Sequence, residues 1–454
     1  MTQLLQRTAL LTLLTLAHAS APAALTAEEI QRLGRELTPL GAERVGNAAG
    51  TIPAWDGGII KAPEGFKGGG HHPDPFAADR PLYTVTRANR AQHAEKLSAG
   101  HQAMLEQYGD SFRMNVYPTR RSAAFPQYYY DATRKIAASA QLIEGGNGVS
   151  GAAVGLPFPI PKNGLEAIWN HILRYRALMA TRHMGQAPVM RDGSFTMVKL
   201  QDDFFARYHA PDATEDGLDN VIIMFLQRIL APARLAGEVL LVHETLNQAK
   251  EHRRAWIYNP GQRRVQRAPN VAFDNTGTGS DGLRTSDQFD MFNGSPERYD
   301  WTLVGRKELI VPYNAYRLHS GEAKYTDIIK PLHLNPELAR YELHRVWVVE
   351  ANLKPGTRHL YKRRTFYLDE DSWQVLHVDQ YDNRDQLWRV SEGHVINYYE
   401  VPTLWTALEV HYDLQSGRYL ALGLNNEEPF TFDFSVKLAP EHFSTNALRQ
   451  EGRR

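Results

Sequence analysis

Two short strand patterns follow one another in RRAWIYNPGQRRVQRAPN, residues 253–270. We expect strands over Ala255–Tyr258 and Arg263–Ala268, joined by a turn at 259–262. Proline fixes φ at the second position of such a turn, and Gly261 accepts the positive φ expected at the third. The stretch therefore predicts a β-hairpin.

The side chains of this hairpin divide between two faces. Because direction alternates along a strand, Trp256 and Tyr258 share one face and Ile257 takes the other. The sequence then continues into SDGLRTSDQFDMFNG, residues 280–294, in which three acids stand among Gly, Ser and Thr. No catalytic constellation is evident here. The pattern is typical of the wall and rim of a β-cavity, with Asp281, Asp287 and Asp290 as turn or rim residues.

Composition limits the class of protein. The chain has 454 residues, of which 43% are hydrophobic and 22% charged, so a core can form and global disorder is excluded. The 51 basic and 51 acidic residues cancel, which leaves no overall field of the kind that nucleic-acid binders carry. Cysteine is absent, so a disulfide scaffold, a thiolate zinc site and a cysteine nucleophile are excluded.

The N-terminus predicts export. Arg7 is followed by the short apolar run Ala9–Ala17, and Ala17-His18-Ala19 matches an A-x-A cleavage site before Ser20. The apolar run is too short to span a bilayer. We therefore expect a cleaved signal peptide and a periplasmic protein that is neither a lipoprotein nor an integral membrane protein.

Three parts are expected along the chain: a signal peptide at 1–19, an N-terminal arm and helical region at 20–161, and a strand-rich domain at 162–454. The arm is rich in Gly and Pro and carries Trp55 and Phe76, so it is expected to pack on the surface in extended form. Beyond it, short strands alternate with turn signals. This rhythm predicts a mainly β (α+β) fold with a large curved antiparallel sheet or half-barrel and a few helices.

Motifs for cofactors and metals are weak. The run Gly146–Gly151 matches G-x-G-x-x-G, but the prolines that follow argue against the helix this motif needs. His71-His72 with Asp74 could ligate a metal, although no second cluster supports it and an extended arm explains the stretch. His243 and Glu244 are neighbours in a strand and face opposite ways. We expect no cofactor and no metal.

Clusters of charged residues are the remaining candidates for a catalytic or binding site. The pairs Asp202-Asp203 and Glu370-Asp371 could act as glycosidase carboxylates, but solvated turn residues are the favoured interpretation. Solvated strand edges are likewise favoured for the basic clusters, which are Arg120-Arg121, Arg253-Arg254, Arg263-Arg264 and Lys362-Arg363-Arg364. No nucleophile has a recognisable base. A non-enzymatic protein is expected.

Several blocks together resemble the bacterial family catalogued as domain of unknown function 1329. They are Gly46–Trp55, His71–Phe76, Tyr117–Ala123, Pro157–Pro161, Trp256–Val265 and Tyr367–Trp373. The blocks Trp256–Val265 and Ser280–Gly294 are also similar to outer-membrane lipoprotein-sorting proteins. That similarity implies a fold like the carriers LolA and LolB, an unclosed β-barrel with helices over its mouth and an apolar cavity.

The resemblance implies a carrier of a lipid or other hydrophobic molecule, accessory to RND-type envelope transport or to outer-membrane lipid or lipoprotein trafficking. One alternative is a ligand-free envelope scaffold that docks a transporter or outer-membrane partner, and another is an envelope lipid or glycan hydrolase. Nucleic acid is not an expected partner. Strand aromatics and one aliphatic residue are the candidate cavity wall, with core packing as the competing interpretation: Trp256, Ile257, Tyr258, Trp347, Phe366, Trp373 and Trp388.

Overall fold

The structure, a computed structural model, describes residues 24–268, 271 and 273–451. The predicted signal peptide lies outside this range. Within it, no helix is both long and apolar enough to cross a membrane.

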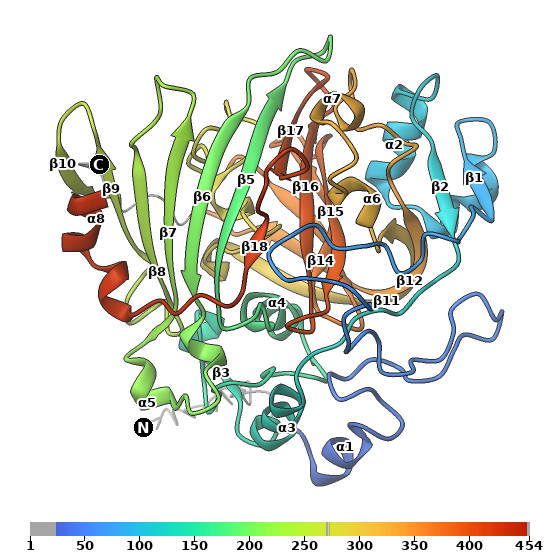
Figure 1. Ribbon diagram of the computed structural model, residues 1–454. Helices are drawn as coiled ribbons and strands as arrows, with labels where there is room; N and C mark the ends of the chain where they lie inside the picture. Colours follow the sequence, from blue (N-terminus) through green and yellow to red (C-terminus); the bar gives the residue numbers. More distant parts are fainter. Residues whose placement is uncertain (1–23, 269–270, 272, 452–454) are drawn as a thin grey trace, which may run out of the picture.

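A single 16-stranded sheet dominates the described residues and curves around the molecule (Figure 1). Its main path runs β1-β2-β12-β13-β14-β15-β16-β17-β5-β6-β7-β8-β9-β10, with β11 paired to β12 and β18 to β5. The pairing of β12 with β2 is parallel and the others are antiparallel. The end strands β1 and β10 do not pair with each other in the described chain, so the sheet is open. The predicted mainly β fold with an unclosed sheet is confirmed.

The strands of this sheet are β1 (Tyr83–Val85), β2 (Met114–Tyr117), β5 (Met179–Val189), β6 (Val198–Phe205), β7 (Val221–Ala231), β8 (Val239–Thr245), β9 (Arg254–Asn259), β10 (Arg264–Arg267), β11 (Tyr299–Pro312), β12 (Tyr341–Leu353), β13 (Arg363–Asp369), β14 (Val375–Tyr381), β15 (Leu387–Tyr398), β16 (Thr403–Asp413), β17 (Arg418–Leu424) and β18 (Phe432–Asp433). A separate hairpin joins β3 (Gln141–Ile143) and β4 (Gly148–Ser150). The α-helices are α1 (Ala27–Arg32), α2 (Ala99–Gln107), α3 (Gln127–Ile136), α4 (Gly164–Leu173), α5 (Glu215–Leu218), α6 (Tyr316–His319), α7 (Tyr325–Ile328) and α8 (Thr445–Glu451).

The predicted hairpin is confirmed as β9 and β10, but its turn differs from the expectation. Asn259 pairs with Arg264, which leaves a four-residue loop between the strands. The positive φ falls on Arg263, at 52°, and Gly261 does not adopt one. The cause is loop length, because four-residue loops are most often built around a type I turn, in which neither central residue needs positive φ.

The N-terminal region contributes directly to the large sheet. Strands β1 and β2 join it beside β12, so the sheet contains residues from both sides of the expected boundary at 161/162. That division stays a prediction. The extended arm packs on the molecule as its aromatic content indicated: Ile52 is buried, and the Trp55 indole donates to the Ala123 carbonyl at 3.3 Å.

Helix α4 fills part of the space within the curved sheet. Its N-cap Asn163 accepts a hydrogen bond from the Glu166 amide, and nine of its ten residues are buried. Trp169 packs with residues of β12, β13 and β14 in one core cluster and donates to the Gly146 carbonyl at 2.8 Å. A Cβ on Gly164 would meet the backbone of Thr302 in β11 at 2.8 Å, so only glycine permits this approach. The helix therefore closes the interior beside β11–β14.

Candidate functional site

A different part of the interior, over β5–β8, remains open, and strand register decides which side chains face it. Phe204, Phe225 and Val242 are cross-strand partners on β6, β7 and β8, and so share one face. One row further along, Gln227 pairs with Leu240, and Leu240 with Ile257. We call this side the cavity face.

The opposite face of the same strands is covered by the C-terminal segment. Leu226, Leu241 and Tyr258 are buried there in one cluster with Phe443 and with Leu448 of α8. Figure 1 shows α8 lying against β8–β10. Because both faces are covered, β7 has no polar face, and its sequence VIIMFLQRILA shows no alternation.

A mainly apolar cavity of about 110 Å³ lies over the cavity face. This is several times the ~10–15 Å³ that one water molecule requires. Its hydrophobic lining comprises Ile172, Phe204, Ala206, Ile222, Ile223, Phe225, Leu240, Val242, Val271, Phe289 and Trp405. An adjoining cavity of about 200 Å³ shares Leu240, Val271, Thr278 and Ser286 with the first and reaches Ile257. The described chain thus leaves mainly apolar space over β5–β8, and none of the described residues of the N-terminal arm lines it.

The cavity is closed by residues 273–293, which we call the cover segment. Arg253 connects both ends of this region to the sheet. Its Nε donates to Glu244 on β8 at 2.8 Å, one Nη donates to the Val271 carbonyl at 2.8 Å, and the other donates to the Asn293 carbonyl. The guanidinium of Arg253 therefore connects the chain near both ends of the cover segment to β8.

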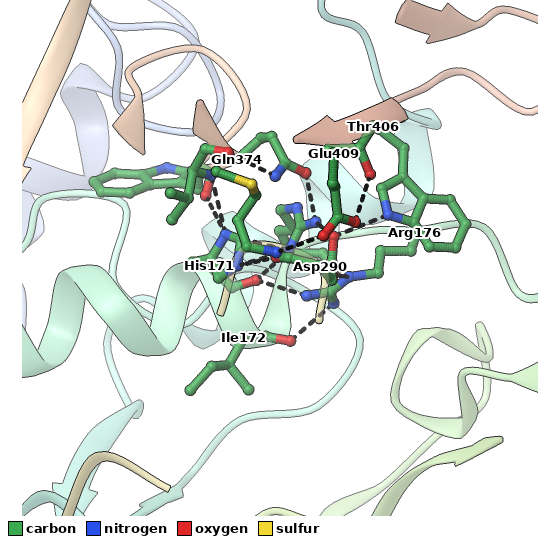
Figure 2. A network of polar contacts seen from close by, with 12 residues as sticks. His171, Ile172, Arg176, Asp290, Gln374, Thr406 and Glu409 are labelled. Atoms are coloured by element: carbon green, nitrogen blue, oxygen red, sulfur yellow. Dashed lines mark hydrogen bonds and ion pairs between the residues drawn. The ribbon is translucent and has the colours of Figure 1, made fainter. Parts of the chain in front are cut away.

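Asp290, on the cover segment, lies in a network of polar contacts with Arg176, which also lines the cavity (Figure 2). It accepts from Arg174 Nη2 at 2.5 Å, from Arg176 Nε at 2.6 Å and from the Trp405 indole at 3.0 Å. Burial opposes ionisation of Asp290, but the two arginines outweigh it and hold the pKa of this carboxyl well below its usual range. Burial and the neighbouring Asp290 charge raise the pKa of Glu409 to about 7. Near neutral pH, Asp290 is therefore ionised, while Glu409 is partly protonated.

Two further arginines reach the cavity with different degrees of pairing. Arg182, on β5, donates through Nε to Asp202 at 2.8 Å. The guanidinium of Arg284, on the cover segment, makes one hydrogen bond within the described residues, to the Thr285 carbonyl at 3.2 Å, although Arg284 is only 5% exposed. Burial lowers the pKa of Arg284 below its ordinary value. The site combines an apolar wall with incompletely paired cationic groups.

The seven wall candidates from the sequence are dispersed. Ile257 lines the adjoining cavity, whereas Trp256 and Tyr258 pack on the α8 side, the division of faces that the hairpin predicts. Trp347 and Trp373 stack on each other with ring centroids 5.9 Å apart, remote from the cavity lining.

The other two aromatic candidates also lie outside the lining. Phe366 is a core residue against Phe292 and Trp301, and Trp388 lies against Tyr361 and donates to Asp413. Of the seven, Ile257 is the one that borders either cavity described above.

The two acidic pairs are buried, which corrects their solvated interpretation. Of the basic clusters, Arg121 and Arg364 are buried, whereas the exposed positions expected at strand edges are found for Arg120, Arg263, Arg264 and Lys362. Asp202 and Asp203 lie within β6, not in a turn, and bond to Arg182 and Arg228. Glu370 and Asp371 are buried beside Arg121, whose Nη2 lies 2.7 Å from Asp371.

The cover acids and two further basic residues require the same correction. Asp287 and Asp290 are buried and are not rim residues, and Arg364 pairs with Asp287 at 2.8 Å. Arg253 is held by Glu244. Asp287 and Asp290 take their arginine partners from 77 and 116 positions away, which local patterns cannot show, whereas Glu244 lies nine positions from Arg253.

Two buried groups have donor atoms close enough to hold a metal ion. In each, three donor atoms lie within 4.8 Å of one another; the groups are His101, His377 and Glu392, and His344, Asp369 and Asp371. In the first group, His101 lies 2.8 Å from Glu392, while His377 bonds outside the group, to Asp379 at 2.7 Å. The predicted candidate His71-His72 is split: His72 bonds to Glu400 and His319, while His71 bonds to the Asn425 carbonyl.

Sequence patterns did not single out the residues that line the cavity. Phe204, Phe225, Leu240 and Val242 lie on strands covered on both sides, where periodicity gives no indication of direction. Arg284 and Phe289 fall within the quoted 280–294 stretch, but their direction depends on how that segment folds back over the sheet. The one indication in the sequence that this stretch contributes to the cavity was its position shortly after the hairpin.

Comparison with known proteins gives consistent family results. Residues 84–449 match the family model described as Protein of unknown function (DUF1329). An uncharacterized protein of Pseudomonas aeruginosa is 50% identical over 451 residues, which cover 99% of each chain.

Two solved structures are similar in part. A putative outer membrane lipoprotein-sorting protein domain from Vibrio parahaemolyticus has 14% identity and a TM-score of 0.43, covering 63% of this chain and 98% of that one. A DUF1329 family protein from Desulfovibrio piger has 14% identity and a TM-score of 0.41, covering 60% and 92%.

Proposed function

Because the chain belongs to the DUF1329 family, whose function is unknown, we propose a function from its own cavity: binding a lipid or other hydrophobic molecule between β5–β8 and the cover segment. The role is non-enzymatic and periplasmic. The observation that carries this proposal is a mainly apolar cavity that shares part of its lining with a second one, in the concave setting that small-molecule sites favour.

Several features support binding in preference to catalysis. The acids weighed as glycosidase carboxylates, Asp202 and Asp371, are each engaged with an arginine. The cavity wall carries Phe204, Phe225 and Trp405, side chains suited to apolar contact. Exported location is supported by the predicted signal peptide and the absence of cysteine. An accessory role with an RND-type transporter or an outer-membrane partner is the corresponding cellular proposal.

The test is whether the protein purified from its native compartment carries a bound hydrophobic compound. The full chain is expressed in its own envelope, purified without detergent, and examined by native mass spectrometry and by solvent extraction. The proposal expects a stoichiometric mass addition that extraction converts into a lipid or other hydrophobic compound. A protein that is free of ligand and does not take up hydrophobic compounds, but co-purifies with a transporter, contradicts the carrier and supports the scaffold.

A matched pair of variants assigns the ligand to this cavity. Ile223 borders the cavity, and its neighbour Met224 packs on the α8 side of the same strand. Ile223→Trp should fill the space and reduce ligand occupancy, while Met224→Trp should leave it close to wild type. Equal occupancy in the two variants would place the ligand elsewhere.

A further inference from the structure

Arg284 is a buried cation without a counter-ion in contact. Among the described residues, no carboxylate oxygen lies within 4.0 Å of its guanidinium, and its Nε has no hydrogen-bond partner. Asp287, a nearby acid, is held by Arg364 and His359. Burying an unpaired charge is costly, so retention of such a group at a cavity wall indicates a partner that arrives from outside the chain.

The local backbone is built to hold this side chain against the cavity. The Gly277 amide donates to the Arg284 carbonyl at 2.9 Å, and Thr276 forms an isolated antiparallel β-bridge with Thr285. A Cβ at Gly277 would approach Arg284 Cζ to 2.7 Å. Glycine at this position leaves the room that the guanidinium occupies.

A second guanidinium lies beside the same ring. Phe289 has Arg182 Cζ at 5.3 Å and Arg284 Cζ at 5.4 Å from its ring centroid. Arg182 uses Nε for Asp202, and none of the hydrogen bonds of the described chain involves its two Nη groups. Both guanidinium groups line the cavity. An anionic group bound in this cavity therefore meets two arginines of its lining.

The charges around the cavity leave a cationic excess. Arg174 and Arg176 are both bonded to Asp290, and Arg182 is bonded to Asp202. Arg284 remains. The other carboxyl near it, Glu409, is protonated in part near neutral pH because burial raises its pKa to about 7. An added anion would balance this excess.

We propose that the ligand is amphipathic and carries an anionic head, a carboxylate or a phosphate, bound by Arg284 and the free Nη groups of Arg182. This inference rests on the proposed function. The hydrophobic chain of this ligand lies along the cavity face, over the cross-strand row of Phe204, Phe225 and Val242. Two charge-assisted contacts fix the head, and the aromatic rows contact the chain.

The experiment compares ligands that share one chain and differ in the head. Delipidated full-length protein is titrated with oleate, with oleoyl lysophosphatidate and with oleyl alcohol, and affinities are measured by calorimetry. At least one anionic ligand is expected to bind about tenfold to a hundredfold more tightly than the alcohol. The tighter of the two anions identifies the source as a fatty carboxylate or a phospholipid.

Variants at Arg284 give the second part of the test. Arg284→Met should abolish the preference for the anion without weakening alcohol binding, Arg284→Lys should restore part of it, and Gly277→Ala should reduce it by displacing the guanidinium. Arg267→Met, at an exposed position of β10, is the control. In ligand-free protein, Arg284→Met should leave the urea midpoint unchanged or raise it, because the charge it removes has no carboxylate in contact.

The outcomes separate the two proposals. Equal binding of anion and alcohol to wild type, or a preference that survives Arg284→Met, overturns the head assignment and leaves the carrier function standing. If none of the three ligands binds, the carrier function fails, and the head assignment fails with it. A large fall in the urea midpoint of ligand-free Arg284→Met would show that Arg284 serves the fold and would also overturn the assignment.

Discussion

At the scale of single residues, buried charge organises the site more than hydrophobic identity does. Asp290 connects the cover segment to Arg174, Arg176 and Trp405 through hydrogen bonds of 2.5–3.0 Å. The sequence shows an aspartate among turn-forming residues, and nothing local indicates that two arginines more than a hundred positions earlier surround it. The burial of Asp290 and its arginine partners could therefore be learned only from the tertiary structure.

Asp290→Asn should strongly destabilise the protein. The substitution leaves Arg174 and Arg176 buried without their counter-charge, and breaking a buried ion pair from one side costs about 3–5 kcal/mol. The measurement is urea unfolding of the variant, with Asp281→Asn, an exposed acid of the same segment, as control. A loss no larger than that of the control would contradict the structural role given to Asp290.

Glu409→Gln should alter the pH dependence of stability. Burial and the Asp290 charge raise the pKa of Glu409 in the folded protein from the ordinary glutamate value of 4.5 to about 7, so between these pH values the folded state holds a proton that the unfolded state has released. Stability contributed by this group is therefore lost as pH rises from about 4.5 to 7. Because glutamine resembles the neutral carboxyl, the variant should match wild type near pH 5 and be more stable near pH 8.

The control for that comparison is Glu441→Gln, at an exposed position. The free energy of unfolding is measured by urea at several pH values for the three proteins. Parallel pH profiles for wild type and Glu409→Gln would show that Glu409 ionises normally in the folded state.

At the scale of elements, the hairpin and its neighbours show where pattern is informative. The β9–β10 hairpin and the opposite directions of Trp256 and Ile257 follow from alternation and are confirmed. Strand β7 gave no such indication, because its two faces are covered by different parts of the chain. The cover segment contains little regular secondary structure, so its position over β5–β8 could not be derived from periodicity.

The cover segment should depend on Arg253. This side chain bonds to the Val271 and Asn293 carbonyls, near both ends of the segment, and to Glu244. Arg253→Met should increase hydrogen exchange of amides in 273–293 by about tenfold or more, the factor that corresponds to losing ~1.4 kcal/mol of local stability.

Arg264→Met is the matched control, since Arg264 is an exposed arginine on the paired strand of the same hairpin. Amides of β15 and β16 serve as the internal reference. Unchanged exchange in the cover segment of Arg253→Met would mean that other contacts hold it.

At the scale of the whole molecule, one open sheet is used in two ways. Beside β11–β14, helix α4 fills the interior with Trp169 and its neighbours; over β5–β8, the interior remains hollow. Composition and turn rhythm predicted a large curved antiparallel sheet or half-barrel, and the resemblance to lipoprotein carriers implied that it is unclosed. They could not predict which part of it would be filled, since both parts contain similar strands.

Trp169→Ala tests the filling role of α4. Removing a fully buried tryptophan should destabilise the protein by about 3–5 kcal/mol, through lost burial and the cavity left behind. The ligand occupancy of protein that remains folded should not change, because Trp169 does not line the cavity over β5–β8. Urea unfolding and native mass spectrometry of the same sample separate the two effects.

The most direct measurement of the central claim is the position of a bound ligand. Crystals of the delipidated protein grown with a brominated fatty acid would locate the chain by the anomalous signal of bromine. The account predicts a bromine peak between Phe225 and the cover segment, over β5–β8. Bromine bound at another surface, with the cavity empty, would contradict it.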